Sequence, residues 1–81
     1  MTEFRTPRFK REFRKFPEQV RKTFRKQVGY LVQDLRHPSL RAKKYDEGRG
    51  IWQARVNDNV RFYFLIEAGR YILLDIERHR D

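Results

Sequence analysis

Two arginines, a tyrosine and a histidine stand at alternating positions in the C-terminal third of the chain. Arg55 precedes a turn-forming segment, Arg61 and Tyr63 follow it, and His79 lies close to the last residue. A guanidinium can form paired hydrogen bonds with phosphate or carboxylate, and an imidazole titrates near neutral pH. Gathered on one surface, these groups would bind RNA or an acidic protein. The alternative interpretation is an ordinary polar sheet face with scattered charges.

The net charge also favours a polyanionic partner. The chain holds 20 Lys and Arg against 11 Asp and Glu, which gives a net charge of +9 at pH 7. Such an excess attracts nucleic acid first and an acidic protein second, although a basic surface can also serve solubility alone. We therefore expect an anionic macromolecule as partner.

Disulfides and metal chemistry are not expected. The sequence has no cysteine, which excludes disulfides and Cys-ligated zinc. Its two histidines and its carboxylates show no ligand spacing such as His-Glu-x-x-His. We predict no metal and no cofactor.

The length of 81 residues fits one domain, residues 1–81, with a core built largely from the 12 aromatic residues. The first residues lack the apolar centre of a signal peptide, and no segment approaches the ~20 apolar residues of a membrane helix. We expect a cytoplasmic protein with no membrane partner. Its oligomeric state stays open.

The N-terminal half predicts two helices. Thr6 suits an N-cap before Pro7, and phenylalanines then recur at helical spacing. Pro17 ends this helix and begins a long amphipathic one, from about Pro17 to Arg36, so that the pair forms a hairpin. The residues before Thr6, Thr2 to Arg5, could be a short strand or a frayed end.

The C-terminal half predicts three strands. Ser39 to Gly50 is irregular and charged, and we interpret it as a loop. Alternation of apolar and polar residues then marks strands around Trp52–Val56, Val60–Glu67 and Tyr71–Glu77. The predicted fold class is α+β, with a two-helix hairpin packed on one face of a small antiparallel meander.

Side-chain alternation assigns the faces of these strands. On the last strand, Ile72, Leu74 and Ile76 would face the helices. The uncovered face would then carry a cluster of polar side chains from all three strands: Gln53, Arg55, Arg61, Tyr63, Glu77 and, if the extended phase continues, His79.

The segment Gly50 to Phe64, which reads GIWQARVNDNVRFYF, resembles the RelE/ParE superfamily of toxin-antitoxin toxins. It is preceded by His37 to Lys44 (HPSLRAKK) and followed by Ile76 to Asp81 (IERHRD). The similarity extends from about Phe9 to the end. Its specific parts are the tryptophan strand, the arginine that opens the next strand, and the terminal His-Arg-Asp.

The resemblance implies chemistry. Members of the ribonuclease branch cut mRNA in the ribosomal decoding site without a metal, by attack of a ribose 2′-hydroxyl on the adjacent phosphate. Arg61 would then clamp the phosphate, Arg55 would add positive charge, and His79 would protonate the departing 5′-oxygen. Arg61 could instead make a surface salt bridge or a turn contact, and His79 could simply be solvated.

Further residues are assigned by the same resemblance. Glu47 and Lys44 are candidates for the general base, because Gln53 replaces the strand lysine of some members. The side chains expected to bind RNA are Lys43, Lys44, Gln53, Tyr63, Arg78 and Arg80. The alternative for Lys43 and Lys44 is a solvated loop.

The implied partners are mRNA in the ribosome and an acidic antitoxin protein. The sequence leaves two alternatives to mRNA cleavage. One is inhibition of DNA gyrase, as in the ParE branch, and the other is a relative that binds RNA or antitoxin without catalysis.

Overall fold

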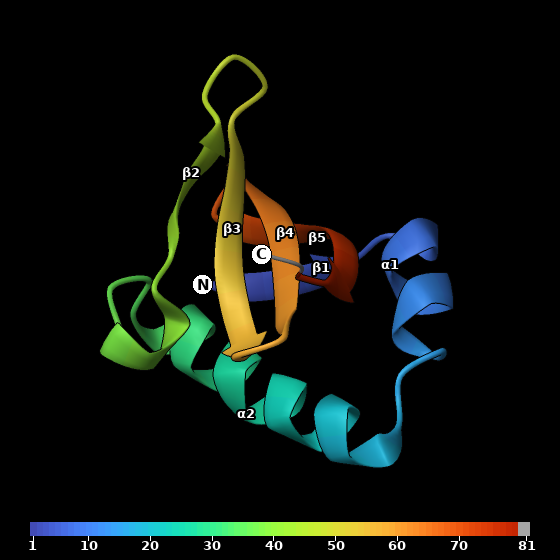
Figure 1. Ribbon diagram of the computed structural model, residues 1–81. Coiled ribbons are helices and arrows are strands. Elements are labelled where there is room, and N and C mark those ends of the chain that lie inside the picture. Colours follow the sequence, from blue (N-terminus) through green and yellow to red (C-terminus); the bar gives the residue numbers. More distant parts are fainter. Residues whose placement is uncertain (80–81) are drawn as a thin grey trace.

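The computed structural model describes residues 1–79. Two α-helices, a short 3₁₀ helix and five strands follow one another along the chain (Figure 1). Their bounds are β1 Thr2–Arg5, α1 Pro7–Phe13, α2 Glu18–Gln33, η1 Pro38–Leu40, β2 Lys43–Asp46, β3 Ile51–Asn57, β4 Val60–Glu67 and β5 Arg70–Arg78. The predicted α+β class is confirmed, with the two helices preceding the three long strands.

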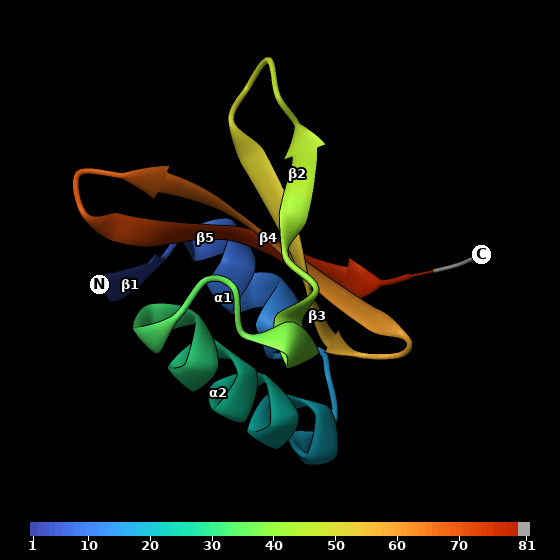
Figure 2. The ribbon, with the colours of Figure 1, turned by 90° about the vertical axis from the view of Figure 1, so that its left-hand side faces the viewer.

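The sheet is wider than the predicted meander. Its order is β1-β5-β4-β3-β2, and the central strands β3, β4 and β5 are antiparallel, as predicted. Thr2–Arg5 forms an edge strand parallel to β5. The predicted loop at Ser39 to Gly50 is wrong in its middle, where β2 pairs with β3 and forms the opposite edge (Figure 2).

The caps of the helices explain where they begin and end. The Thr6 hydroxyl accepts a hydrogen bond from the Phe9 backbone N–H (3.2 Å) and donates one to the Leu73 carbonyl (2.8 Å). It thus begins α1 and fixes it to β5. The second helix ends at Gln33, before the predicted Arg36. Neither described helix is long and apolar enough to cross a membrane.

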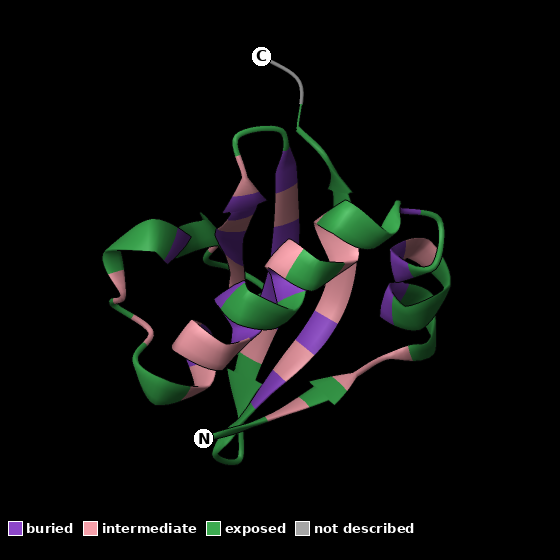
Figure 3. Cartoon of the chain, turned by 90° about the horizontal axis from the view of Figure 1, so that it is seen from below, coloured by how far each residue is buried: buried purple, intermediate pink, exposed green. Residues whose placement is uncertain are grey.

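Both helices lie on one face of the sheet, and the core fills the space between. In Figure 3 the buried positions of the strands lie behind α2. Phe24 is fully buried, with its ring centroid 5.2 Å from Phe9, 5.1 Å from Phe13 and 5.2 Å from Phe62. Packing of aromatic rings therefore joins α1, α2 and β4.

Because of a β-bulge, the predicted faces of β5 are wrong in the first part of the strand. The pairing shifts between Tyr63 and Phe64, which lie opposite Asp75 and Leu73, so Leu74 is an extra residue. Before the bulge, Tyr71 and Leu73 are buried in the core, whereas we expected Ile72 and Leu74 there. Beyond the bulge, Ile76 is buried in the core, as the alternation predicted.

Candidate functional site

Arg55 and Arg61 are cross-strand neighbours at the end of the β3–β4 hairpin. The Arg61 Nη1 donates to the carbonyl oxygens of the hairpin turn, at 2.7 Å from Asn57 and 3.2 Å from Asp58. These bonds fix one corner of the guanidinium. Its Nε and Nη2 donate to no other described residue, so they remain for a ligand.

Arg55 has a partner of its own. Its Nη2 donates to the Asp58 carboxylate in the same turn, and its side chain is only 20% exposed. This ion pair offsets part of the positive charge at the hairpin end. The turn thus holds both arginines in place, and Arg61 is the one with donors to spare.

His79 follows β5 at the same end of the sheet. Its backbone N–H donates to the Asn59 carbonyl oxygen (2.7 Å), which extends the β4–β5 pairing by one residue. The histidine backbone therefore lies beside the turn that holds Arg61. The structure brings the three predicted catalytic residues, Arg55, Arg61 and His79, to one region.

A chain of hydrogen bonds crosses the middle of the open face. Gln53 Nε2 donates to the Tyr63 hydroxyl (3.2 Å), which donates to Glu77 Oε1 (3.0 Å). Burial raises the pKa of Tyr63, and the Glu77 carboxylate raises it further. The phenol therefore stays protonated at neutral pH and remains a donor to Glu77.

The expectation that Gln53 and Tyr63 lie on an uncovered surface is wrong. They are only 7% and 8% exposed. Strand β2 lies alongside, and the Tyr45 ring stands edge-on to Tyr63 with centroids 4.9 Å apart. These two residues position Glu77 and are poorly placed to contact RNA directly.

The other predicted RNA-binding residues are divided between the two faces. Lys43 pairs in register with Gln53, whereas Lys44 lies opposite Trp52 with its ammonium 5.2 Å from the indole centre. Arg78 covers the Phe16 ring at 5.4 Å, on the side of the helices. The prediction for Arg80 lies outside the described residues. Glu47, a candidate base, is exposed in the β2–β3 turn.

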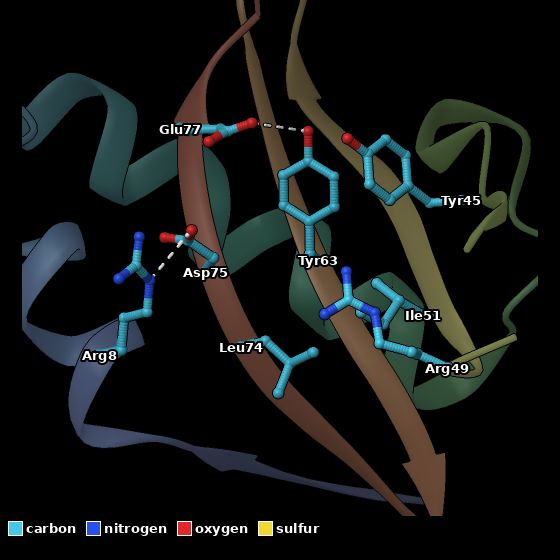
Figure 4. A pocket seen from close by; sticks show the side chains of 8 residues that line it. All are labelled: Arg8, Tyr45, Arg49, Ile51, Tyr63, Leu74, Asp75 and Glu77. Carbon is cyan, nitrogen blue, oxygen red and sulfur yellow. Dashed lines mark hydrogen bonds and ion pairs between the residues drawn. The ribbon is translucent and has the colours of Figure 1, made fainter. Parts of the chain in front are cut away.

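A cavity of about 360 Å³ opens beside Tyr63, on the sheet face opposite α2 (Figure 4). Two carboxylates, two guanidinium groups and two phenol rings line it, from Asp75, Glu77, Arg8, Arg49, Tyr45 and Tyr63. Arg8 Nε lies 3.2 Å from Asp75 Oδ2, and Arg49 Nε donates to Asp46 (2.8 Å). The latter bond lowers the pKa of Asp46, which stays ionised at neutral pH.

The sequence reasoning missed most of this cavity. Tyr45 lies in the segment that we interpreted as a loop. Its strand, β2, is short and shifts register between Lys44 and Asp46, so it shows no clear alternation in the sequence. Arg8 lies on α1, far from β5 in the sequence. The one sequence signal for the cavity was Glu77, which side-chain alternation assigns to the same face as Tyr63.

Among residues 1–79 no group of three or more His, Cys, Asp or Glu side chains is arranged to hold a metal ion. Three arginines of the open face, Arg8, Arg49 and Arg55, are instead each paired with a single carboxylate. What this face offers a ligand is hydrogen bonding and charge.

Comparison of sequences gives no relative. No protein-family model matches the chain, and no curated protein matches it significantly.

Comparison of structures gives several similar proteins. The YoeB/ParE toxin from Agrobacterium tumefaciens is similar with a TM-score of 0.78 and 10% identity, over 99% of this chain and 100% of that one. The toxin-antitoxin complex RelBE2 from Mycobacterium tuberculosis contains a chain at TM-score 0.77 and 18% identity, with 99% and 92% covered. The intact RelBE complex from Escherichia coli gives 0.74 and 11%, with 99% and 98% covered.

These similarities define the class of fold: two helices on one face of a small mixed sheet whose other face is open. They extend over nearly the whole of this chain and of the two neighbours. The chain has the fold of the RelE/ParE toxins. The resemblance found in the sequence is thus confirmed at the level of the fold.

Proposed function

We propose that the chain is the toxin of a type II toxin-antitoxin system and acts in the cytoplasm as a ribosome-dependent mRNA endoribonuclease. In this proposal the 2′-hydroxyl attacks the scissile phosphate without a metal. An acidic antitoxin protein would cover the basic surface and block it.

The observation that carries the proposal is the position of Arg61 within a RelE/ParE fold. The turn carbonyls hold its Nη1 and leave Nε and Nη2 as donors. Two donors on one planar group match two phosphoryl oxygens. Preorganised donors of this kind stabilise the charge that develops on phosphorus in the transition state.

The neighbours of Arg61 supply the remaining roles. Arg55, directly across the hairpin, adds positive charge near the phosphate. As an arginine it keeps its proton and cannot act as the base. His79, beside the same turn, would donate a proton to the departing 5′-oxygen.

The test is translation in a cell-free bacterial system, with mRNA cleavage followed in the presence and absence of ribosomes. We expect cleavage only with ribosomes. Arg61→Ala should lower the single-turnover rate by ~10² to 10³ with little loss of ribosome binding. Arg21→Ala removes a helix arginine that pairs with Glu18, and should change mainly salt-dependent association.

A modified substrate separates the roles of Arg61 and His79. A bridging phosphorothiolate at the scissile position provides a leaving group that needs no proton. His79→Ala should recover most of its lost rate on this substrate, while Arg61→Ala stays slow. Equal rescue of both variants, or of neither, would show that His79 is not the acid.

The ParE-like alternative predicts a different outcome. If translation continues while the purified chain blocks supercoiling by DNA gyrase, the protein is a gyrase inhibitor. If both processes continue, the chain binds RNA or antitoxin without the proposed toxic activity.

A further inference from the structure

The cavity beside Tyr63 differs in charge from the rest of the molecule. The chain carries a net charge of +9, yet the cavity lining holds two carboxylates and two guanidinium groups, which cancel. Asp75 and Glu77 would repel a phosphate, while Arg8 and Arg49 would repel a cationic side chain. The lining therefore fits an uncharged group with both donors and acceptors.

An exposed aromatic ring forms one wall. Tyr45 is 57% exposed, although large apolar surfaces are usually buried, and its ring is held edge-on against Tyr63. Flat ligands stack on such rings, and single-stranded RNA is bound in this way, with its bases turned out onto tyrosine or phenylalanine. At about 360 Å³ the cavity is in the range of small-ligand sites.

The unbonded carboxylate oxygen of Glu77 can distinguish between the bases. The Tyr63 hydroxyl donates to its Oε1, and its Oε2 has no hydrogen bond or ion pair with the described residues. An ionised carboxylate accepts only, so its best match is an edge with two adjacent donors. Guanine has such an edge in N1–H and the N2 amino group, whereas the Watson–Crick edges of adenine, cytosine and uracil do not pair two donors.

Arg49 complements the opposite edge. In Figure 4 its guanidinium and the Glu77 carboxylate lie at opposite ends of the Tyr63 side chain. Its Nε is bound to Asp46, which leaves the terminal nitrogens as donors. Arginine donates in pairs to O6 and N7 of guanine, the edge away from the N2 amino group.

From these observations we infer that the cavity is a guanine-binding subsite for single-stranded RNA, with Glu77 as the residue that determines specificity. The inference rests on the proposed RNA-directed function and adds to it a base preference. Gln53 and Tyr63 position Glu77, and Tyr45 provides the stacking surface.

The test measures direct binding of the full chain to RNA pentamers without ribosomes. The pentamers carry guanine, inosine or adenine at the centre of a uridine tract. We expect the guanine pentamer to bind about tenfold or more tightly than the adenine pentamer. Inosine, which lacks the N2 amino group, should lose most of this advantage.

A matched pair of variants assigns the preference to the cavity. Glu77→Gln removes the carboxylate and should bind guanine and adenine pentamers equally. Glu67→Gln removes the same charge from an exposed glutamate at the end of β4 near the β4–β5 turn, and should keep the preference. Equal affinity of the unmodified chain for all three pentamers, or a guanine preference that survives Glu77→Gln, would overturn the inference.

A second readout identifies the occupant. Guanosine should shift the backbone amide signals of Tyr45 and Glu77 in an NMR titration. If arginine amide shifts them and guanosine does not, the cavity takes a cationic protein side chain and the inference is overturned.

The outcomes separate this inference from the proposed function. If mRNA is cleaved on ribosomes but the pentamers bind equally, the subsite is disproved and the toxin proposal stands. If the Glu77-dependent guanine preference is present while translation continues, the subsite stands and ribosome-dependent cleavage is disproved.

Discussion

The side chains on the two faces of the sheet are held in place by different interactions. On the covered face, rings from α1, α2 and β4 pack around Phe24, and among the described residues the one charged group against them is the Arg5 guanidinium, 5.2 Å from the Phe24 ring centroid. On the open face, the contacts are hydrogen bonds and ion pairs, such as Tyr63 to Glu77 and Arg8 to Asp75. Burying a phenylalanine contributes about 1.5 to 3 kcal/mol, whereas an exposed ion pair contributes about 0 to 1 kcal/mol.

The difference indicates that one face serves mainly stability and the other mainly binding, a division that substitutions can test. The covered face supplies the free energy of folding, so the open face can keep charged groups that contribute little to stability. Substitutions on the two faces should therefore separate stability from binding, and the size of their effects tests this division.

The largest expected effect is on the covered face. Phe24→Ala removes a fully buried ring that contacts three others, and should lower the free energy of unfolding by about 3 to 5 kcal/mol. Chemical denaturation followed by circular dichroism measures it. Arg61→Ala on the open face should cost less than about 1 kcal/mol. Comparable losses in the two variants would contradict the division.

A smaller effect is expected at the boundary of the core. Gln27 is 4% exposed, and its Nε2 donates to the carbonyl oxygens of Arg55 (3.0 Å) and Ser39 (3.2 Å). Gln27→Ala leaves both acceptors without this donor, which should cost about 1 to 3 kcal/mol.

Gln33→Ala is the matched control, because Gln33 ends the same helix and is exposed. It should change the stability by less than about 0.5 kcal/mol. If Gln27→Ala is equally harmless in thermal denaturation, the bond from α2 to β3 does not stabilise the fold.

The main elements could be predicted because local rules determine them. Thr6 and Pro7 begin α1 by capping, and Pro17 begins α2, as the sequence indicated. The strands β3 and β4 follow from alternation alone. What escaped prediction depends on contacts between distant segments: β1 is a strand because β5 lies beside it, and β2 because β3 does.

The candidate site was predicted in part for the same reason. Alternation placed Arg55, Arg61 and Glu77 correctly, because no bulge separates them from their partners. It could not foresee the extra residue at Leu74, which reverses the faces of β5, or the approach of Tyr45 over Tyr63. Hence the arginine pair was found, and the cavity was not.

The smallest expected effect concerns the hydrogen-bond chain of the open face. Tyr63→Phe removes the donor to Glu77 and the acceptor of Gln53, and should cost about 0.5 to 1.5 kcal/mol at neutral pH. Tyr45→Phe is the control, since no hydrogen bond of the Tyr45 hydroxyl occurs among the described residues, and its cost should be near zero.

The dependence on pH sharpens this last comparison. The pKa of Tyr63 in the folded state is raised above its ordinary 10.0, chiefly by burial, so folding favours the protonated phenol. This contribution is fully present below pH 10.0 and is lost as the pH rises through the raised pKa. Burial also raises the pKa of Tyr71, which acts in the same direction.

In denaturation series from neutral pH to about pH 11, Tyr63→Phe should therefore lose stability less steeply than the unmodified chain. Tyr71 accounts for the pH dependence that remains in this variant. Tyr45→Phe should retain most of the slope, because Tyr45 is the smallest of the causes that raise the pKa of Tyr63. Identical slopes in all three proteins would show that the fold does not hold the Tyr63 phenol in its protonated form.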